Sequence, residues 1–366
     1  MDAARKKPPR RIHLFHSGSI GDTLIPIPFL NAIRAKWPDA ETVIFSCSAC
    51  TGPACVRELP GPSGPVDRVS GFTTSGSIPQ IVLRLFASVG QVRREHFDLA
   101  ININQTAPKY YALRMKLWRV WCLLGGIRHW MGDKSLFIFP AVRPDVPVPP
   151  VPHHMDITAA RLEADGIMIP DRRIDLRLTD EERRHAQEVW DGKAAAAVGD
   201  KVPVAVGVGG KKLRWPVERF EELIRRVSEP GIVPVFFGGR ENCVEIDEMI
   251  AHLGFGFDAA DAGLTTLRET VAFMENCRFY VGNDTGTLHM AVAAGLKCVG
   301  IYSAHNFPGA WNPYGEGHIV LRHDLPCAGC LAAVCPKGSP ACIESITVDE
   351  VEDAVKRMLR QVMEQK

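Results

Sequence analysis

Short apolar runs alternate with amphipathic stretches along almost the whole chain. Ile12–Phe15 precedes a helical pattern from Thr23 to Lys36, and Thr42–Phe45 has the continuous apolar character of a buried strand. The same alternation predicts strands over 98–103, 202–208, 232–237, 278–281 and 298–302, and helices over 155–165, 179–190, 216–228, 241–252, 267–276 and 286–295. Alternating helices and apolar strands indicate parallel sheets covered by helices on both faces. The predicted fold class is therefore α/β.

A proline-rich segment over residues 140–152 interrupts this alternation. Proline removes a backbone donor and fixes φ, so the segment is expected to run as an extended and fairly stiff connector. Two sheets fit the chain length better than one, at about 100–200 residues per domain. We place the boundary near residue 175, which gives domains over 1–175 and 176–345 and a further helix over 346–366.

Composition narrows the class of protein. The 366 residues include 43 Lys and Arg against 42 Asp and Glu, a formal charge of +1, which argues against a dedicated nucleic-acid binder. Eleven cysteines, an odd number in a large chain, favour a reducing compartment over a disulfide scaffold. The start of the chain has no secretory apolar stretch, and no run reaches the roughly 20 apolar residues of a membrane span. The expected location is the cytoplasm.

The first segment with candidate functional residues is Ser17-Gly18-Ser19-Ile20-Gly21-Asp22, where the first strand ends and a helix begins. Ligands of open α/β sheets bind at the carboxyl ends of strands, and glycines allow the backbone to approach them closely. The segment is neither a Walker A loop nor a Gly-x-Gly-x-x-Gly fingerprint. From position alone, Asp22 is either a site residue or a carboxylate stabilised by the start of a helix.

The second segment is Val281-Gly-Asn-Asp284-Thr285-Gly286-Thr-Leu-His289. A strand ends here and a helix opens at about Gly286, so backbone N–H groups are available for a phosphate or diphosphate. Asp284 and Thr285 also suit a helix N-cap, and His289 also suits a semi-buried position. Polar groups gathered at a strand-to-helix turn within apolar sequence favour a site.

The third segment, Gly207-Val-Gly-Gly-Lys211-Lys212-Leu213-Arg214-Trp215-Pro216, follows the first strand of the second half. Its glycines and three cations precede a helix whose first turn Pro216 suits. Such a loop is able to neutralise a diphosphate.

In this order and spacing, the three segments resemble those of glycosyltransferase family nine, the ADP-heptose:lipopolysaccharide heptosyltransferase family. The likeness runs nearly from end to end and is strongest over 261–302. It implies a GT-B architecture of two Rossmann-like domains facing a central cleft, an acceptor-side domain over 1–175 and a nucleotide-sugar-binding domain over 176–345. The helix over 346–366 often packs back onto the first domain in this family.

The resemblance also implies the activity and the site. It implies an inverting, metal-independent transfer of a heptose-like sugar from a nucleotide-diphosphate sugar, such as ADP-heptose, to a glycan or lipid-linked acceptor such as lipopolysaccharide core. No cofactor and no nucleic acid are implied. Asp22 matches the general base, and Ser17, Gly18 and Gly21 belong to its acceptor-side loop. The donor-binding residues that match are Asp284, Thr285, Gly286 and His289. Leu213 stands where the family has a diphosphate-binding lysine, so Lys212 and Arg214 are both named, and Glu241 matches a ribose-binding acid.

Two other functions remain open alternatives. A sugar-nucleotide epimerase of related fold would act on the donor without an acceptor, and a non-catalytic nucleotide-sugar-binding protein would not turn over any donor. Asp22 together with the diphosphate cations argues against the second alternative.

Two further features stay outside this assignment. Cys327, Cys330, Cys335 and Cys342 are spaced densely enough for a structural metal, but reduced thiols without a metal are the favoured interpretation. Residues 109–128 hold five Lys and Arg, no acid and four Tyr or Trp. This helix is either a peripheral contact with the cytoplasmic face of the inner membrane, next to a lipid-linked acceptor, or a partly buried helix flanking the acceptor site.

Overall fold

The chain forms two compact units in a computed structural model. The structure describes residues 7–48, 54–61, 64–73, 77–105, 111–143, 146, 148–193, 198–199, 201–210, 213–228, 231–258, 265–332 and 334–364. Unit 1 comprises the described residues up to Phe139 together with His154–Arg177. Unit 2 comprises those of Pro140–His153 and those from Leu178 onward. The chain therefore passes between the units more than once, whereas the sequence suggested one boundary.

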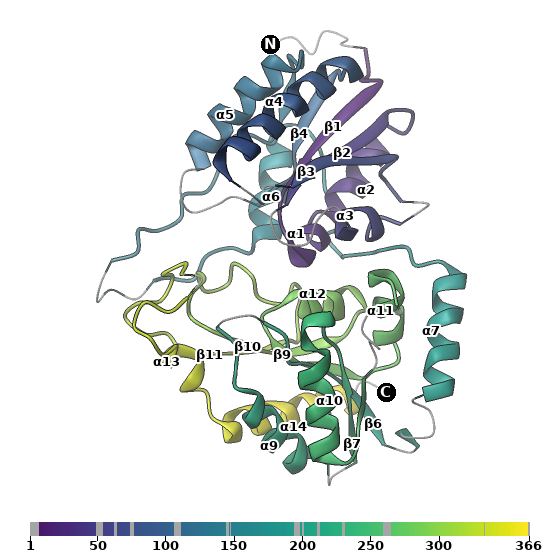
Figure 1. The fold of residues 1–366 in the computed structure, drawn as a ribbon, viewed down its shortest axis with the longest axis vertical. Coiled ribbons are helices and arrows are strands. Elements are labelled where there is room, and N and C mark those ends of the chain that lie inside the picture. The colour runs from purple at the N-terminus through teal and green to yellow at the C-terminus, as the bar shows by residue number, and fades with distance from the viewer. Residues whose placement is uncertain are drawn as a thin grey trace. The chain divides into compact units, whose positions relative to one another are not determined.

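Unit 1 is built on a five-stranded parallel sheet of order β3-β2-β1-β4-β5 (Figure 1). The strands are β1 (Arg11–His16), β2 (Glu41–Ser48), β3 (Arg68–Thr73), β4 (Leu99–Asn102) and β5 (Trp130–Met131). The helices are α1 (Ile20–Leu24), α2 (Ile27–Lys36), α3 (Ala54–Glu58), α4 (Ile78–Glu95), α5 (Tyr111–Leu124) and α6 (His154–Ala164). The single helix expected over 23–36 is two helices, α1 and α2, with Pro26 at the N-cap position of α2.

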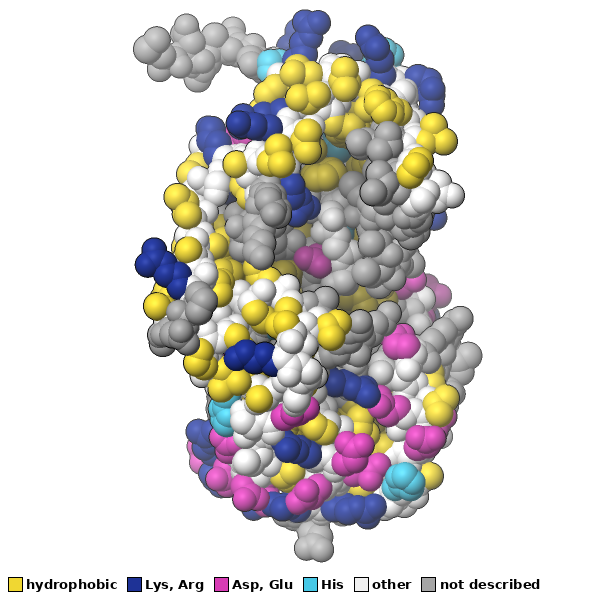
Figure 2. Space-filling view, turned by 60° about the vertical axis from the view of Figure 1, so that its left-hand side comes forward, with side chains coloured by type: hydrophobic (Ala, Val, Ile, Leu, Met, Phe, Trp, Pro, Cys, Tyr) yellow, Lys and Arg dark blue, Asp and Glu magenta, His cyan; other side chains and the backbone are white. Residues whose placement is uncertain are grey.

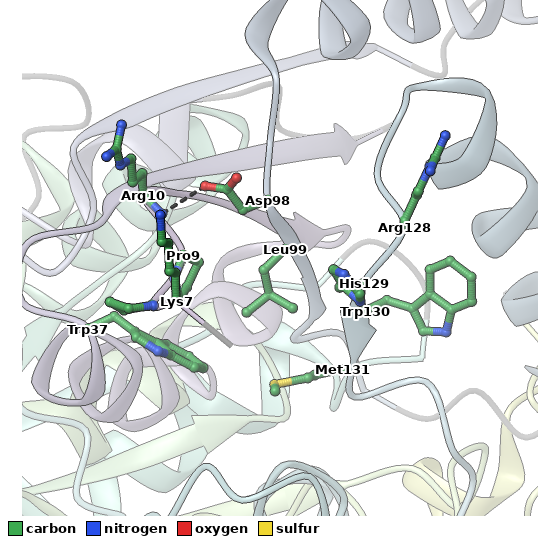
Figure 3. A pocket seen from close by; sticks show the side chains of 11 residues that line it. Lys7, Pro9, Arg10, Trp37, Asp98, Leu99, Arg128, His129, Trp130 and Met131 are labelled. Carbon is green, nitrogen blue, oxygen red and sulfur yellow. Dashed lines mark hydrogen bonds between the residues drawn. The ribbon is translucent and has the colours of Figure 1, made fainter. Parts of the chain in front are cut away.

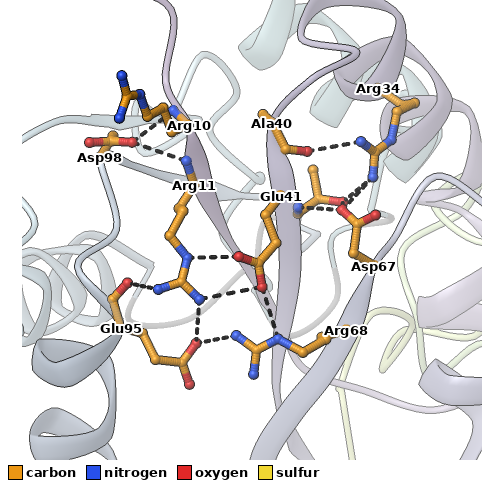
Figure 4. A network of polar contacts seen from close by, with 10 residues as sticks. Arg10, Arg11, Arg34, Ala40, Glu41, Asp67, Arg68, Glu95 and Asp98 are labelled. Atoms are coloured by element: carbon orange, nitrogen blue, oxygen red, sulfur yellow. Dashed lines mark hydrogen bonds and ion pairs between the residues drawn. The ribbon is translucent and has the colours of Figure 1, made fainter.

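Ion pairs join the amino ends of the strands in unit 1 (Figure 4). Arg11 on β1 and Arg68 on β3 both bind Glu41 on β2, at 2.8 and 3.0 Å, and Arg68 also binds Glu95 at the end of α4. These side chains are partly exposed, so each pair contributes at most about 1 kcal/mol. Their role is to fix the register of β1, β2 and β3 at the edge opposite the candidate site.

Unit 2 is built on a six-stranded parallel sheet of order β11-β10-β9-β6-β7-β8. The strands are β6 (Val202–Gly207), β7 (Ile232–Phe236), β8 (Phe257–Asp258), β9 (Phe279–Asn283), β10 (Lys297–Tyr302) and β11 (Ile319–Arg322). The helices are α7 (Asp180–Lys193), α9 (Val217–Ser228), α10 (Cys243–Leu253), α11 (Leu267–Met274), α12 (Gly286–Ala293), α13 (Ala341–Glu344) and α14 (Val348–Glu364), with a 3-10 turn η1 (Arg240–Asn242).

A large apolar core lies on one face of this sheet. Phe220 of α9 and Met249 of α10 are fully buried there, together with Val351 and Met358 of α14. The helix expected over 346–366 is thus α14, and it packs within unit 2 against α9 and β10. Packing of this helix onto unit 1 stays a prediction.

The proline-rich connector lies in unit 2 from Pro140 to His153. Its described residues form neither helix nor strand, in agreement with the proline content, and the backbone N–H of Val151 donates to the carbonyl of Pro308 at 2.8 Å. Among the residues that the structure describes, no helix combines the length and apolar character needed to cross a bilayer.

Each sheet reverses its strand order at one point. In unit 1 the reversal lies between β1 and β4, and in unit 2 it lies between β6 and β9. In open α/β sheets, ligands bind outside the carboxyl ends of the strands at such a reversal. The topology therefore predicts ligand binding at the loops that follow β1 and β4 in unit 1, and at those that follow β6 and β9 in unit 2.

Candidate functional site

Asp22 lies in the first turn after β1, beside the reversal point of unit 1. Its carboxylate accepts hydrogen bonds from the backbone N–H of Ser19 at 2.7 Å and from the Ser19 hydroxyl at 3.0 Å. Burial raises the pKa of Asp22 above its ordinary value, and the two Ser19 bonds partly oppose this shift. The result is an oriented, partly desolvated carboxylate.

Gly18 makes this position of Asp22 sterically accessible. Its φ is +143°, a conformation that side chains disfavour, and a Cβ at this residue would lie 2.2 Å from the Cβ and Cγ of Asp22. Gly21 is buried, and its carbonyl accepts the N–H of Ile25 at 3.1 Å. Ser17 is partly buried at the end of β1. Of the predicted loop residues, Gly18 thus lies directly against Asp22.

The main chain of Asp22 is fixed by two side chains. His16 Nε2 lies 3.3 Å from the Asp22 carbonyl, and the amide of Gln105, which follows β4, donates to the same carbonyl at 3.2 Å. Burial lowers the pKa of His16 to about 4, so the ring is neutral at physiological pH. Gln105 brings the loop after β4 to the carboxylate loop, as the strand reversal requires.

Buried polar groups gather at the carboxyl end of β4, and none of them was predicted as a site residue. Arg161 of α6 is 1% exposed, and its guanidinium donates to the Tyr111 hydroxyl at 2.7 Å and to the carbonyls of Asn102 and Asn104. The Asn102 side-chain oxygen accepts from the backbone N–H of Asn104 at 3.1 Å. Arg161 lies 50 or more residues from these partners, so no local motif predicts it.

In unit 2, the turn between β9 and α12 brings four predicted residues together. Thr285 occupies the N-cap position of α12, and Gly286 is its first residue. The Thr285 hydroxyl bonds to Thr287 Oγ1 at 2.9 Å and does not cap the helix backbone. His289 Nε2 lies 3.9 Å from Asp284 Oδ1. Thr285 thus occupies the N-cap position, as the N-cap interpretation expects, but its side chain does not bond to the helix backbone. The first turn of α12 therefore still presents backbone N–H groups.

Burial gives Asp284 and His289 unusual protonation behaviour. The pKa of Asp284 is raised to about 7 by burial, against a hydrogen bond from Asn306 and the nearby charge of Arg322. The pKa of His289 is lowered to about 3, mainly by burial. Their side chains retain 16% and 6% exposure. Near pH 7, His289 is therefore neutral and Asp284 is partly protonated, so this turn carries less negative charge than a fully ionised carboxylate would give it.

The loop after β6 adjoins the same turn. Asn283 accepts from the backbone N–H of Trp215 at 2.9 Å, and its amide donates to the carbonyls of Val208 and Gly209 at 3.2 and 3.1 Å. Asn283 was part of the quoted motif but was not predicted as a site residue. It fixes the position of the glycine-rich loop relative to α12.

The two predicted diphosphate cations differ in what the structure shows. Lys212 lies outside the described residues. Arg214 forms a two-bond ion pair with Glu245 of α10, at 2.6 and 2.5 Å. A Cβ on Gly210 would lie 3.2 Å from Arg214 Cβ and 3.6 Å from Thr285 Cγ2, which places Arg214 next to the α12 turn. Its charge is shared with Glu245 and is only partly available to a ligand.

Two further residues lie at the carboxyl edge of this sheet. Glu241 is exposed in η1, just after β7, and its carboxylate folds over Gly239, where a Cβ would lie 2.5 Å from Glu241 Oε2. Arg322 at the end of β11 was not predicted. Its guanidinium binds the carbonyls of Ser303, Ala304 and Asn306 at 3.2, 3.3 and 2.8 Å. Its only signal in the sequence is a position directly after a short apolar run.

The four C-terminal cysteines gather around one small cavity. Cys327, Cys330, Cys335 and Cys342 are free thiols and line a space of about 30 Å³ together with His305 and Leu213. Burial raises the pKa of the Cys342 thiol. Within the described ranges, no three His, Cys, Asp or Glu side chains are arranged to hold a metal ion. His153 makes a tilted ring contact with Tyr314, and Asp156 pairs with Arg172.

A larger hollow lies at the opposite edge of the unit 1 sheet (Figure 3). It measures about 1000 Å³ and is bordered by Arg10, Trp37, Asp98 and Trp130, among others. It adjoins the amino ends of β1 and β4. The Asp98 carboxylate there already accepts hydrogen bonds from the backbone N–H groups of Arg10 and Arg11, at 2.7 and 3.0 Å. No predicted site residue borders this hollow.

Comparison with known proteins places the chain in a family. The profile of glycosyltransferase family 9 (heptosyltransferase) matches residues 87–340. Lipooligosaccharide heptosyltransferase 2 of Campylobacter jejuni is 24% identical over 157 residues, which cover 41% of this chain and 48% of that protein. The chain thus spans about half the length of this curated relative.

Solved structures show the same fold. A family 9 glycosyl transferase from Veillonella parvula superposes with a TM-score of 0.67 and 18% identity, covering 96% of this chain and 97% of that one. Escherichia coli heptosyltransferase WaaC with ADP-2-deoxy-2-fluoro heptose gives a TM-score of 0.58 and 16% identity, covering 95% and 99%. The predicted α/β class and GT-B architecture are confirmed. The chain belongs to glycosyltransferase family 9, the heptosyltransferase family.

Proposed function

We propose that the protein is an inverting glycosyltransferase that moves a heptose-like sugar from a nucleotide-diphosphate sugar to a glycan or lipid-linked acceptor. Family membership supports the reaction class. The ADP-heptose analogue held by the Escherichia coli structure supports an ADP-heptose donor, and the lipooligosaccharide relative supports a lipopolysaccharide-core acceptor. The observation that carries the proposal is the Asp22 carboxylate, oriented by Ser19 and partly desolvated beside the reversal point of unit 1.

In the proposed reaction, Asp22 is the general base. The acceptor hydroxyl oxygen attacks the anomeric carbon, its proton passes to the Asp22 carboxylate, and the bond to the diphosphate oxygen breaks with its electron pair. Attack from the face opposite the leaving group inverts the anomeric centre. A raised pKa suits this role because a stronger base accepts the proton more readily, and such catalysis contributes about 10²–10⁴-fold.

Unit 2 supplies the binding of the donor in this proposal. The backbone N–H groups at the start of α12 and the cations Lys212 and Arg214 stabilise the charge that develops on the departing nucleotide diphosphate. Thr285, Gly286 and His289 border the same turn, and Glu241 is the candidate partner for the ribose hydroxyls. Asp284 does not repel the anion while it is protonated, which its pKa of about 7 permits.

The test is transfer from ADP-heptose to a heptose-deficient lipopolysaccharide core by the purified protein, followed by ADP release and by NMR of the new anomeric linkage. Asp22→Asn keeps an oxygen that accepts from Ser19, so the loop is expected to stay folded and ADP affinity to stay within about twofold. Turnover is expected to fall by about 10²–10⁴-fold.

The matched control is Asp39→Asn, which changes an exposed acid of the same unit and is expected to keep full turnover. Unchanged turnover of Asp22→Asn would refute the role of Asp22. Conversion of ADP-heptose without an acceptor would indicate an epimerase instead, and binding without any turnover would indicate a non-catalytic protein.

A further inference from the structure

Helices α4 and α5 expose an unusual amount of apolar surface. Leu83 and Phe86 of α4 are 71% and 66% exposed, and Leu113, Leu117, Val120 and Leu124 of α5 are 52–61% exposed. The four α5 residues follow the spacing i, i+4, i+7, i+11, which lines them up along one side of the helix. Such a stripe normally faces a core. Here it faces away from one.

The opposite side of α5 is already packed. Tyr111, Met115, Trp118 and Trp121 are buried against the sheet, where Trp121 lies 5.1 Å from the His13 ring and 5.3 Å from the Phe45 ring. Seating the aromatic residues on the sheet leaves the leucine stripe outside. The stripe is therefore a second apolar face of a helix whose core-facing side is filled.

The exposed stripes of the two helices form one surface. Trp121 Nε1 donates to Ser88 Oγ at 3.1 Å, and a Cβ on Gly125 would lie 2.7 Å from Val92. Both pairs differ by 33 in sequence, so the helices run parallel with that offset. The same offset brings Leu83 level with Lys116 and places Phe86 between the levels of Leu117 and Val120. The six exposed side chains define a surface that we term the α4–α5 face, and exposed apolar surface of this kind marks an interaction site when basic or polar residues border it.

Basic residues accompany this apolar surface. α5 carries Arg114, Lys116 and Arg119 and no acid, and the exposed Arg93 and Arg94 lie at the end of α4. Arg119 pairs with Asp133, while Arg114 and Lys116 are exposed and take part in no ion pair with any residue that the structure describes. Figure 2, which turns this side of unit 1 forward, shows hydrophobic and basic side chains over its upper part and few acidic ones there.

We propose that the α4–α5 face docks on a lipid bilayer that carries anionic headgroups. Leucine and phenylalanine side chains insert at the boundary between headgroups and acyl chains, and cations on the same helix bind the headgroups above. A protein partner would be matched by shape and by charges of both signs, whereas this face offers a long apolar stripe with one sign of charge. The proposal goes beyond sugar transfer, because it concerns where the enzyme binds and not what it transfers.

The direct test is flotation of the full-length protein with vesicles, without any donor or acceptor. At 0.15 M salt the protein is expected to float with vesicles of phosphatidylcholine and phosphatidylglycerol at 7:3 and to stay in solution with phosphatidylcholine alone. Raising the salt to 0.5 M is expected to release at least half of the bound protein, because salt screens the attraction between the basic side chains and the anionic headgroups.

Paired variants separate the two contributions. Arg114→Gln with Lys116→Gln, and separately Phe86→Ser with Leu117→Ser, are each expected to reduce vesicle binding at least fivefold. The controls are Arg184→Gln with Arg357→Gln for the charge change and Met168→Ser with Met363→Ser for the apolar change, all at exposed positions elsewhere. The controls are expected to stay within twofold of the unaltered chain.

Circular dichroism and the thermal shift produced by ADP show whether each variant keeps its fold and its nucleotide site. Absence of binding to anionic vesicles, or equal loss in variants and controls, would overturn the proposal. A Leu117-dependent dimer in light scattering without vesicle binding would also overturn it, by assigning the face to a second copy of the chain. Because flotation needs no sugar transfer, its failure is distinct from failure of the proposed enzyme activity.

Discussion

Replacing Asp284 by Asn tests the electrostatics of the α12 turn directly. The pKa of Asp284 is raised from 3.8 to about 7 because the folded chain buries the carboxyl group. A raised folded-state pKa means that the native state binds a proton more tightly than the unfolded state does. The stability that Asp284 contributes is therefore fully present below pH 3.8 and is lost as the pH rises through 7.

The size of the loss follows from the difference between the two pKa values. A shift of about three units corresponds to about 4 kcal/mol at a pH well above 7. The Asp284 side chain keeps 16% exposure and Arg322 lies nearby, so this figure is an upper bound. An Asn at this position carries no charge and still accepts the hydrogen bond from Asn306. We therefore expect Asp284→Asn to stabilise unit 2 by about 2–4 kcal/mol at pH 8.5 and to have little effect at pH 4.

Urea unfolding followed by tryptophan fluorescence and circular dichroism, from pH 4 to 8.5, measures this difference. Asp247→Asn on α10 is the matched control, because it removes an exposed carboxylate from the same unit. The difference in stability between Asp284→Asn and the unaltered chain must grow between about pH 4 and pH 7 and level off above. A constant difference over this range would refute the assignment of a buried carboxyl group with a raised pKa.

Two further variants test unit 1. Gly18→Ala places a Cβ 2.2 Å from Asp22 and is expected to lose about 1–3 kcal/mol of stability and most transfer activity. The control is Gly126→Ala, at φ +85°, where a Cβ would meet no described atom within 4 Å apart from its chain neighbours, so it carries backbone strain alone and is expected to retain activity. Equal activities of the two variants in the transfer assay would contradict the steric argument. His13 is fully buried, and its pKa is lowered to about 3, so the unaltered chain loses stability as the pH falls below 6.5. His13→Phe is expected to reduce the loss between pH 7 and pH 5 by about 2 kcal/mol in urea titrations, and an unchanged loss would contradict it.

The sequence predicts best what is local. The loop at Asp22 and the turn at Asp284–His289 are short strand-to-helix connections, so their glycines, caps and hydrogen bonds come from neighbouring residues. Strand β1 and strand β9 could be predicted because continuous apolar runs are buried on both faces of a parallel sheet. The break between α1 and α2 has an equally local cause, because Pro26 interrupts the backbone bonding.

What the sequence does not predict depends on distant partners. Arg161 is held by the carbonyls of Asn102 and Asn104, and Arg214 is paired with Glu245, which lies 31 residues away. On α5 the charges do not segregate to one side, so the helix gave two interpretations. Its orientation is decided by the fit of Trp118 and Trp121 on the sheet, a property of tertiary packing.

The charges at the unit 2 turn bear on how a chain of nearly zero net charge would bind the proposed diphosphate. Arg214 shares its charge with Glu245, and Arg322 is surrounded by backbone carbonyls, so neither gives a free cation. In the proposed site, protonation of Asp284 near pH 7 removes negative charge, and the start of α12 presents N–H groups in addition to the cations Lys212 and Arg214. Donor affinity should then weaken as the pH rises above 7 and the Asp284 carboxyl group ionises. We therefore infer that the ionisation of one buried carboxyl group, together with the charges of Lys212 and Arg214, sets the affinity of the proposed site for a diphosphate.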